Sequence, residues 1–162
     1  MITVALEDPG TPDAAILLDE LSNTLKTITG SSGGASFDPS DVRLERARFA
    51  VARDRDGNAI GCGAFRPLEN DIAEIKRMYS RGSIQGIGST VLLFLEKEAV
   101  GLGYAALRLE TRRVNERAVS FYERAGYQRI PNFGKYVGRA EAVCFEKRLK
   151  PNDPRPGLDN AG

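Results

Sequence analysis

Hydrophobic residues in the first half of the chain repeat with two different periods. Residues 2–6 form a short apolar run and the apolar positions of residues 11–27 recur at helical spacing, which predicts a strand followed by an amphipathic helix. Residues 48–54 and 59–65 alternate as strands do on both sides of the turn sequence DGN, so they predict a β-hairpin. A further strand is expected at residues 71–80.

From residue 86 onward the pattern changes to helices that alternate with strands. Residues 86–103 carry apolar side chains at helical spacing and end on glycines, which predicts a helix with a glycine stop. Asn115 is a good N-cap for a second helix that ends at Gly126. The remaining strands are predicted at residues 105–111, 127–130 and 142–149. Strands first, then helices between strands, indicate an α/β protein with a mixed central sheet and helices on its faces.

Two segments lack a periodic pattern. Residues 29–41 are dense in glycine and serine, which predicts a long loop without helix or strand, of the kind that often serves a site. Residues 151–162 hold three prolines and almost nothing apolar, so a flexible tail is expected there. The 41% hydrophobic content of the 162 residues suffices for one core. We therefore expect a single domain over residues 1–150.

Charge and composition exclude several classes of function. With 23 Lys+Arg against 22 Asp+Glu, the formal charge of +1 gives no general attraction to nucleic acid or to a membrane surface. Apolar runs stay far below the roughly 18 residues that span a bilayer, and no secretion signal precedes them, so we expect a cytoplasmic protein. The absence of histidine removes Ser-His and Cys-His catalysis and most catalytic zinc sites, so no metal is expected. Cys62 and Cys144 are expected to be buried free thiols.

The sequence QGIGST at residues 85–90 joins a strand to an amphipathic helix. Two glycines let backbone N–H groups approach a ligand, and the helix N-terminus adds the positive end of its dipole, so a phosphate group is the expected guest. A nucleotide-hydrolase P-loop would need a lysine before Ser89, where Gly88 stands. A dinucleotide fold is a second alternative, since Glu110 follows at about the ribose-binding distance of ~20 residues, but Val91 replaces its third glycine.

Four stretches of the second half together resemble one known family. EIKRMYS, QGIGSTVLLFLEKEA, LGYAALRLET and NERAVSFYERAGY are similar to strand 4, the pyrophosphate loop with helix 3, strand 5 and helix 4 of the GNAT superfamily of N-acetyltransferases. The resemblance covers residues 74–127 strongly and the rest by element order. It implies a GNAT-like acyl-CoA N-acyltransferase fold, with a mixed, mostly antiparallel central sheet and helices on both faces. The chain departs from the family at Ser83, where the loop usually carries Arg or Gln.

The resemblance implies which residues hold acetyl-CoA, the expected co-substrate. In the family, strand 4 splays from strand 5 and binds the pantetheine arm, and the Met78 N–H would be the candidate oxyanion donor. The pyrophosphate would rest on backbone amides, helped by Arg81, because the usual cation of the loop is missing. Asn115 would both cap its helix and contact the cofactor. The residues assigned to acetyl-CoA are Met78, Tyr79, Ser80, Gln85, Gly86, Ile87, Gly88, Ser89 and Asn115.

Direct attack of an amine on the thioester needs a base, an oxyanion donor and an acid for the departing thiolate. Tyr122 matches the family tyrosine that points at the sulfur and serves as general acid; the alternative is an aromatic core anchor on an amphipathic helix. Glu74 is the candidate base, since it differs from Met78 by four residues and is expected on the same face of the strand. The alternatives are a surface carboxylate paired with Lys76 or Arg77, or a base elsewhere that acts through water.

The acceptor pocket of the family is built from loops that correspond to Phe37, Arg66, Arg77 and Tyr136 here. Arginines in such a pocket indicate an amine that carries a carboxylate, such as an amino acid. We therefore expect direct N-acetylation of a small amine, without a covalent enzyme intermediate and without nucleic acid or membrane partners. The alternatives are acetylation of a protein N-terminus or lysine, which would need an open groove, and a catalytically inactive acyl-CoA sensor. A homodimer is compatible with the family.

Overall fold

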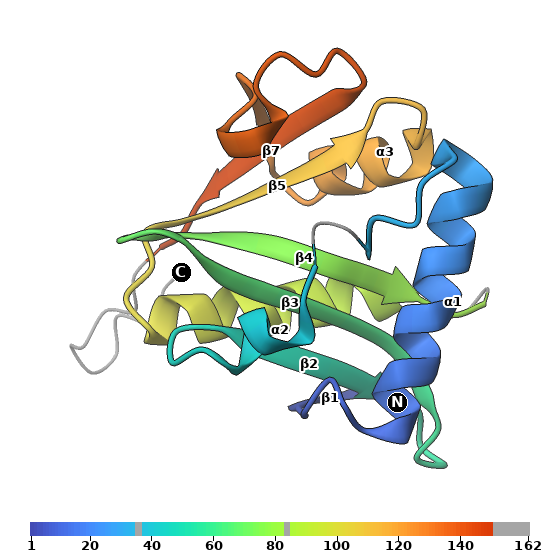
Figure 1. Ribbon diagram of the computed structural model, residues 1–162. Helices are drawn as coiled ribbons and strands as arrows, with labels where there is room; N and C mark the ends of the chain where they lie inside the picture. The colour runs from blue at the N-terminus through green and yellow to red at the C-terminus, as the bar shows by residue number, and fades with distance from the viewer. Residues whose placement is uncertain (35–36, 83–84, 151–162) are drawn as a thin grey trace.

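One seven-stranded sheet runs through the chain in the order β1-β2-β3-β4-β5-β7-β6 (Figure 1). The structure is a computed structural model that describes residues 1–34, 37–82 and 85–150. β4 and β5 pair in parallel and the other neighbours are antiparallel, so the sheet is mixed and mostly antiparallel, as predicted. The strands are β1 (Thr3–Leu6), β2 (Arg48–Arg53), β3 (Ala59–Glu69), β4 (Ile72–Ser80), β5 (Ala106–Arg112), β6 (Gln128–Ile130) and β7 (Ala142–Arg148).

Helices cover both faces of this sheet, which confirms the predicted architecture. α1 (Pro12–Thr29) packs on one face, where Ala14 and Leu17 join a buried cluster with β2 and β3. α2 (Ile87–Gly101) and α3 (Glu116–Arg124) pack on the opposite face and contribute to the larger core cluster. Each fully buried apolar side chain in such a core stabilises the fold by about 1.5–3 kcal/mol. The expected buried free thiols are confirmed, since Cys62 and Cys144 are both buried and unpaired.

The ends of α1 follow the capping signals of the sequence. The Thr11 hydroxyl accepts a hydrogen bond from the Ala14 N–H at 3.3 Å, and Pro12 occupies the first turn. Gly30 closes the helix with a φ of 83° and donates its N–H to the Lys26 carbonyl. The C-terminal end of α1 lies beside the gap between β4 and β5 (Figure 1).

β4 and β5 pair only over their first three residues. Ile72 to Glu74 face Ala106 to Arg108, and no further register pair joins the two strands. Beyond this point they diverge, and α1 and α3 stand on either side of the open end (Figure 1). The backbone of the second half of β4 therefore has no ladder partner on the β5 side.

A β-bulge at Arg77 interrupts the alternation of β4. Two residues of β4 stand opposite one of β3, because Ala64 pairs with Lys76 while Cys62 pairs with Tyr79. Arg77 has a φ of 57°, in the left-handed region that non-glycine residues seldom adopt. Side chains of β4 beyond the bulge therefore lie on the opposite face of the sheet from the one that an unbroken two-residue alternation would give them.

The bulge corrects one expectation about the site. Glu74 bonds to Arg66 on the α1 side of the sheet, whereas Met78 packs against the core on the α2 side. The prediction that these two side chains share a face is wrong, since the extra residue shifts the two-residue period. Gly63 faces the bulge, and a Cβ there would collide with the Met78 sulfur.

The loop expected at residues 29–41 contains the start of a short helix, so the prediction of a segment without helix is wrong at its end. A short 3-10 helix, η2 (Pro39–Arg43), begins there, because Asp38 accepts a hydrogen bond from the Ser40 N–H at 2.9 Å and Pro39 fixes the first turn. A second one, η3 (Gly134–Tyr136), lies between β6 and β7. The predicted tail at 151–162 lies outside the described residues. Among the residues that are described, no helix is long and apolar enough to cross a membrane.

Candidate active site

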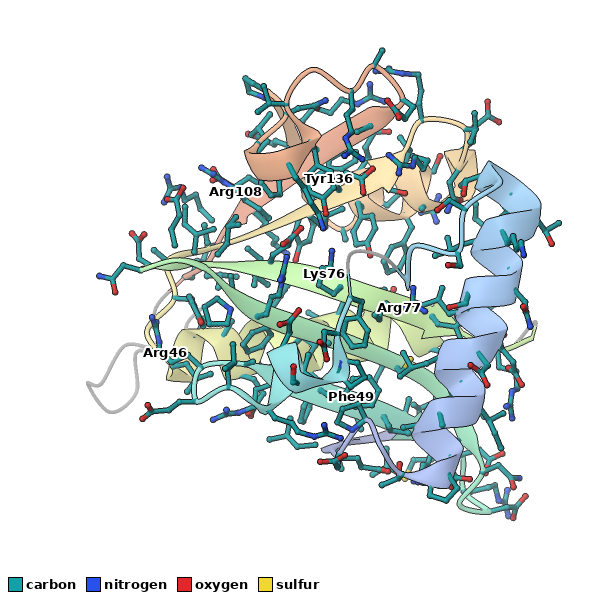
Figure 2. All side chains as sticks on the ribbon, in the orientation of Figure 1. Arg46, Phe49, Lys76, Arg77, Arg108 and Tyr136 are labelled. Atoms are coloured by element: carbon teal, nitrogen blue, oxygen red, sulfur yellow. The ribbon has the colours of Figure 1, made fainter. Side chains whose placement is uncertain are left out.

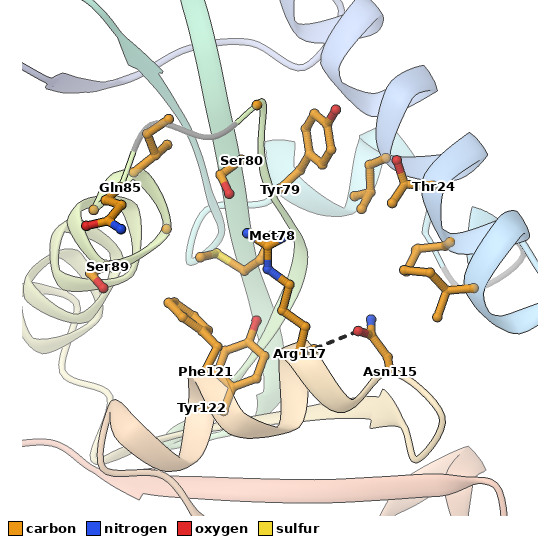
Figure 3. Close-up of a pocket in the computed structure, with 18 of the residues that line it drawn as sticks. Thr24, Met78, Tyr79, Ser80, Gln85, Ser89, Asn115, Arg117, Phe121 and Tyr122 are labelled. Atoms are coloured by element: carbon orange, nitrogen blue, oxygen red, sulfur yellow. Dashed lines mark hydrogen bonds between the residues drawn. The ribbon is translucent and has the colours of Figure 1, made fainter.

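Three adjoining cavities follow the gap between β4 and β5. The first, the cofactor cleft, has about 500 Å³ and extends between the N-terminus of α2, β4, α1 and α3 (Figure 3). The second, the inner cavity, has about 150 Å³ and lies where β4 and β5 diverge. The third, the outer cavity, has about 340 Å³ and borders the connection between β6 and β7. Leu25 and Asn115 line all three, so the cavities adjoin one another along the site.

The N-terminus of α2 presents backbone donors to the cofactor cleft. Gly86 is its N-cap with a φ of 89° and no side-chain cap, and the first turn contains no acidic residue. The early N–H groups of a 15-residue helix are thus left for a ligand, and its dipole favours an anion. Gln85, Gly88 and Ser89 line the same cleft. The segment predicted to bind pyrophosphate therefore lies at a cleft wall, while Ser83 falls outside the described residues.

Gly88 has a different physical role from Gly86. A Cβ at Gly88 would lie 3.2 Å from the Phe121 ring, which is tighter than nearly all real contacts of this kind. The glycine thus allows α2 and α3 to approach closely and brings Tyr122 toward the same cleft.

The cations of the cleft are not those expected from the sequence. Arg81 donates to Glu20 at 2.7 and 2.9 Å and to the Ala59 carbonyl, so its guanidinium is already engaged. Arg117 and Arg124 of α3 line the cleft instead. The sequence carried a signal for them, since a separation of seven residues places both on one face of a helix.

The residues of β4 assigned to the cofactor line the cleft together. Met78, Tyr79 and Ser80 all contribute to its wall (Figure 3), on the part of β4 that has no β5 partner. The Tyr79 hydroxyl donates to Glu20 at 3.0 Å. Asn115 caps α3 by accepting from the Ala118 N–H at 3.3 Å, as predicted, and also borders the cleft.

Tyr122 stands between the cofactor cleft and the inner cavity and lines both. Its ring packs against Tyr127 and Phe145, with centroids 5.7 and 6.2 Å away. Burial raises its pKa above the usual 10, so the phenol keeps its proton at neutral pH. Among the described residues no partner for its hydroxyl is found, so this group is left for a ligand. Tyr122 can therefore anchor the core with its ring and still offer its hydroxyl as a general acid.

Glu74 is the centre of a buried polar network. It is only 1% exposed, and its Oε1 accepts from Arg66 at 3.1 and 3.3 Å. Its Oε2 accepts from the Tyr136 hydroxyl at 3.0 Å and lies 3.7 Å from the Lys76 ammonium. Both carboxylate oxygens are thus engaged, which makes Glu74 the anchor of this region as well as a candidate base.

Lys76 and Tyr136, both labelled in Figure 2, complete the network and line the inner cavity. The Lys76 ammonium donates to the Tyr136 hydroxyl at 3.2 Å. Burial lowers the pKa of Lys76, and burial together with the Glu74 charge raises the pKa of Tyr136. The contact joins residues 60 positions apart, so the β6–β7 connection is tied to β4.

The remaining residues assigned to the acceptor separate into two groups. Tyr136 and Arg77 line the inner cavity, whereas Phe37 and Arg66 line none of the three cavities. Arg66 bridges Glu74 and Asp41 of η2. Arg77 donates to the carbonyls of Leu18 and Ser32 and to the Ser22 hydroxyl, and it lies 5.5 Å over the Phe37 ring. Both arginines therefore tie neighbouring segments to the sheet.

Glu110 of β5 is a site residue that sequence reasoning considered only for a dinucleotide fold. It lines both the inner and the outer cavity. Burial raises the pKa of its carboxyl, while Arg112 at 3.3 Å and Lys76 lower it. The splay of β4 from β5 is what exposes this strand position to the cavity, and the sequence pattern gives no sign of it.

The comparisons with known proteins agree with this geometry. The Acetyltransferase (GNAT) family model matches residues 18–127. The IAA acetyltransferase of Azospirillum brasilense is 30% identical over 151 residues, which cover 91% of this chain and 98% of that protein. A structure from Klebsiella pneumoniae, described as a candidate acyl-CoA N-acyltransferase, is 28% identical with a TM-score of 0.78 and covers 93% of this chain and 99% of that chain.

A more distant solved structure shares the fold. A GNAT family acetyltransferase from Elizabethkingia anophelis, solved with acetyl-CoA bound, has a TM-score of 0.67 at 18% identity and covers 91% of this chain and 98% of that chain. That likeness shows the shared fold. Since the family model spans most of the sheet, both walls of the cofactor cleft and Tyr122, this chain belongs to the GNAT family and is an acetyl-CoA-dependent acyltransferase.

Proposed function

We propose that this chain transfers the acetyl group of acetyl-CoA to a primary amine of a small molecule by direct attack of the amine on the thioester. The observation that carries the proposal is the row of three adjoining cavities, in which the inner cavity shares Tyr122 with the cofactor cleft and Glu110 with the outer cavity. Two ligands entering from opposite ends would meet beside Tyr122. In this proposal residues 1–150 act as one domain.

Acetyl-CoA would occupy the cofactor cleft with its phosphates at the N-terminus of α2. The free N–H groups behind Gly86 suit the pyrophosphate, and Arg117 and Arg124 supply positive charge at the same cleft. The pantetheine arm would add to the unpaired edge of β4 at Met78 and Ser80. The thioester carbonyl would then lie near the Met78 N–H, which we propose as the oxyanion donor.

Tyr122 would protonate the departing thiolate. Its raised pKa keeps the phenol in the proton-carrying form, and its place at the junction of two cavities suits a proton transfer at the thioester. The negative charge that leaves as thiolate is thereby neutralised without a covalent enzyme intermediate.

Two carboxyl groups are candidates for the base that accepts the proton of the amine. Glu74 can act through the Tyr136 hydroxyl, which donates to it at 3.0 Å, but its oxygens already accept three hydrogen bonds. Glu110 lines the route of the amine directly and has a pKa raised by burial, which makes it the better proton acceptor near neutral pH. Glu74→Gln and Glu110→Gln separate the two, because only the base variant loses the acidic limb of the pH profile of kcat/KM.

The small size of the acceptor side argues for a small molecule over a protein substrate. The inner and outer cavities have about 150 and 340 Å³, which fits a compact amine, whereas a protein terminus or lysine needs an open groove. The relative from Azospirillum brasilense is named for a small acceptor, in line with this choice.

The test is acetyl transfer to a panel of amines. Release of coenzyme A is followed with a thiol reagent for amino acids, polyamines, aromatic amines, aminoglycosides and short peptides, and the product is identified by mass spectrometry. Faster release with at least one small amine, together with its acetylated product, supports the proposal. Acetylation of peptides alone points to a protein acetyltransferase, and tight acetyl-CoA binding without any transfer points to a sensor.

A further inference from the structure

The outer cavity carries an excess of positive charge. Its charged lining residues are Arg112, Lys135 and Arg139 against the carboxylate of Glu110. Arg112 lies 3.3 Å from Glu110 and compensates its charge. In the described part of the chain, Lys135 and Arg139 lie within ion-pair distance of no carboxylate. Two cations without a carboxylate partner among the described residues thus line one cavity.

These two cations stand on a connection whose backbone is fixed. The Asn132 side chain donates to the carbonyls of Tyr136 and Arg139 at 3.1 and 2.9 Å. Tyr136 is only 4% exposed and anchors the same turn to Glu74. The backbone positions of Lys135 and Arg139 are therefore set by hydrogen bonds, unlike those of cations on an unconstrained surface loop.

The carboxylate of the same space lies on the side that adjoins the inner cavity. Glu110 lines both the outer and the inner cavity, and Arg139 lies close enough to influence its ionisation. An ammonium ion near Glu110 would stand at the entrance of the inner cavity, toward Tyr122, which lines it too. The outer cavity therefore combines two cations that do not line the inner cavity with a carboxylate at the border to it, and this arrangement suits a zwitterion whose amine points toward the inner cavity.

We infer that the acceptor is a small amine that also carries a carboxylate, with the carboxylate held by Lys135 and Arg139 and the amine directed past Glu110 toward Tyr122. This inference rests on the proposed function and adds the class of acceptor. It moves the recognition of the carboxylate away from Arg66 and Arg77, because these two are engaged by Asp41, Glu74 and backbone carbonyls.

The chemistry of the inferred acceptor sets the bonds that change. The amine nitrogen forms the amide bond to the acetyl carbon, the carbon–sulfur bond of the thioester breaks, and the acceptor carboxylate keeps its charge. A guanidinium and an ammonium at that carboxylate act in the ground state and the transition state alike, so their loss raises KM more than it lowers kcat.

The experiment compares matched pairs of amines with the full-length protein. Each amino acid of the panel is paired with its decarboxylated amine and with its carboxamide, for example phenylalanine with phenethylamine and phenylalaninamide. We expect kcat/KM to favour the carboxylate-bearing partner by about tenfold or more, the effect of one charge-assisted hydrogen bond. Higher salt should reduce this preference, since the cations are exposed.

Charge-neutral variants assign the preference to its residues. Lys135→Gln and Arg139→Gln should each reduce the preference, and the double variant should abolish it with the activity on the decarboxylated amines retained. Lys97→Gln and Arg55→Gln are matched controls, because both are exposed cations that line none of the three cavities. These controls should leave the preference unchanged, and thermal unfolding verifies that all variants fold.

The outcomes separate this inference from the proposed function. Transfer to small amines with equal or better activity on the partners that lack the carboxylate overturns the inference and leaves the proposed function standing. A carboxylate preference that survives in the double variant also overturns it, because other residues then recognise the carboxylate. No transfer to any small amine, with acetyl-CoA still bound, overturns the proposed function and the inference together.

Discussion

Tyr122 and Tyr127 form a natural pair for testing the acid role. Both rings are buried, at 7% and 3% exposure, and their centroids lie 5.7 Å apart. The hydroxyls differ, because Tyr127 donates to Glu96 at 2.8 Å, whereas Tyr122 has no such partner in the described part of the chain and lines two cavities. Replacing each tyrosine by phenylalanine removes one oxygen from the same core.

The two substitutions should have opposite effects on stability and activity. Tyr127→Phe removes the 2.8 Å donor to the Glu96 carboxylate, which then keeps only the Lys147 ammonium at 3.2 Å, so it should lower the free energy of unfolding by about 1–3 kcal/mol. For a chain of this length, that corresponds to a loss of about 2–4 °C in Tm per kcal/mol. Tyr122→Phe breaks no internal hydrogen bond and should leave the Tm within about 1 °C of the parent, or raise it.

The effect on kcat should have the opposite order, with the larger loss in Tyr122→Phe. Loss of a general acid lowers kcat by about a hundredfold or more, so Tyr122→Phe should be severely impaired while Tyr127→Phe stays within about threefold of the parent. The assay is steady-state kinetics with the best amine, together with calorimetric titration of acetyl-CoA, which both variants should bind with nearly unchanged affinity. An unaltered kcat in Tyr122→Phe refutes the acid role, and an equal loss in both variants indicates that the tyrosines act through the core.

Three further outcomes can be measured on the same protein. Gly86→Ala should lower the free energy of unfolding by about 1–2 kcal/mol because alanine is strained at this positive φ, and it should weaken acetyl-CoA binding in calorimetric titration. Gly57→Ala is the control, since Gly57 has a similar φ of 85°; it should lower the Tm without changing the affinity. Burial raises the pKa of Cys62 from 9.0 to about 12, so the folded state holds this proton more tightly than the unfolded state. The resulting contribution to stability is present below about pH 9 and is lost as the pH rises toward 12. The urea midpoint of unfolding should therefore fall less steeply with rising pH in Cys62→Ala than in the parent. Glu74→Gln should lower the free energy of unfolding by about 3 kcal/mol, measured with urea, because it removes the buried negative charge that Lys76 and Arg66 share. Full stability with lost activity would mean that the carboxylate is only a base.

The element order of this fold was accessible from the sequence, because local signals determine it. The period of the apolar residues predicted the strands and helices, and the predicted N-cap at Asn115 sets a helix start that the structure confirms. The glycine-rich segment before α2 also lies at a cleft, since the signal for it is contained in six consecutive residues. The 3-10 turn at Pro39 was missed, because its signal is short and lies in a polar loop.

The interior of the site could not be predicted in the same way, because it depends on contacts between distant segments. The bulge at Arg77 is set by pairing with β3 and moves Glu74 and Met78 to opposite faces. The Tyr136–Glu74 hydrogen bond joins positions 62 residues apart, so no local pattern indicates that this carboxylate is already engaged. Glu110 became a site residue only through the divergence of two strands.

The central claim is that the gap between β4 and β5 is a site of acetyl transfer from acetyl-CoA to a small amine. The most direct test is amine-dependent release of coenzyme A by the purified chain, with mass spectrometry of the amine after the reaction. The account predicts release that follows the amine concentration and an amine that has gained one acetyl group, both greatly reduced in Tyr122→Phe. Release that is independent of every amine tested, or equal in the parent and in Tyr122→Phe, would contradict it.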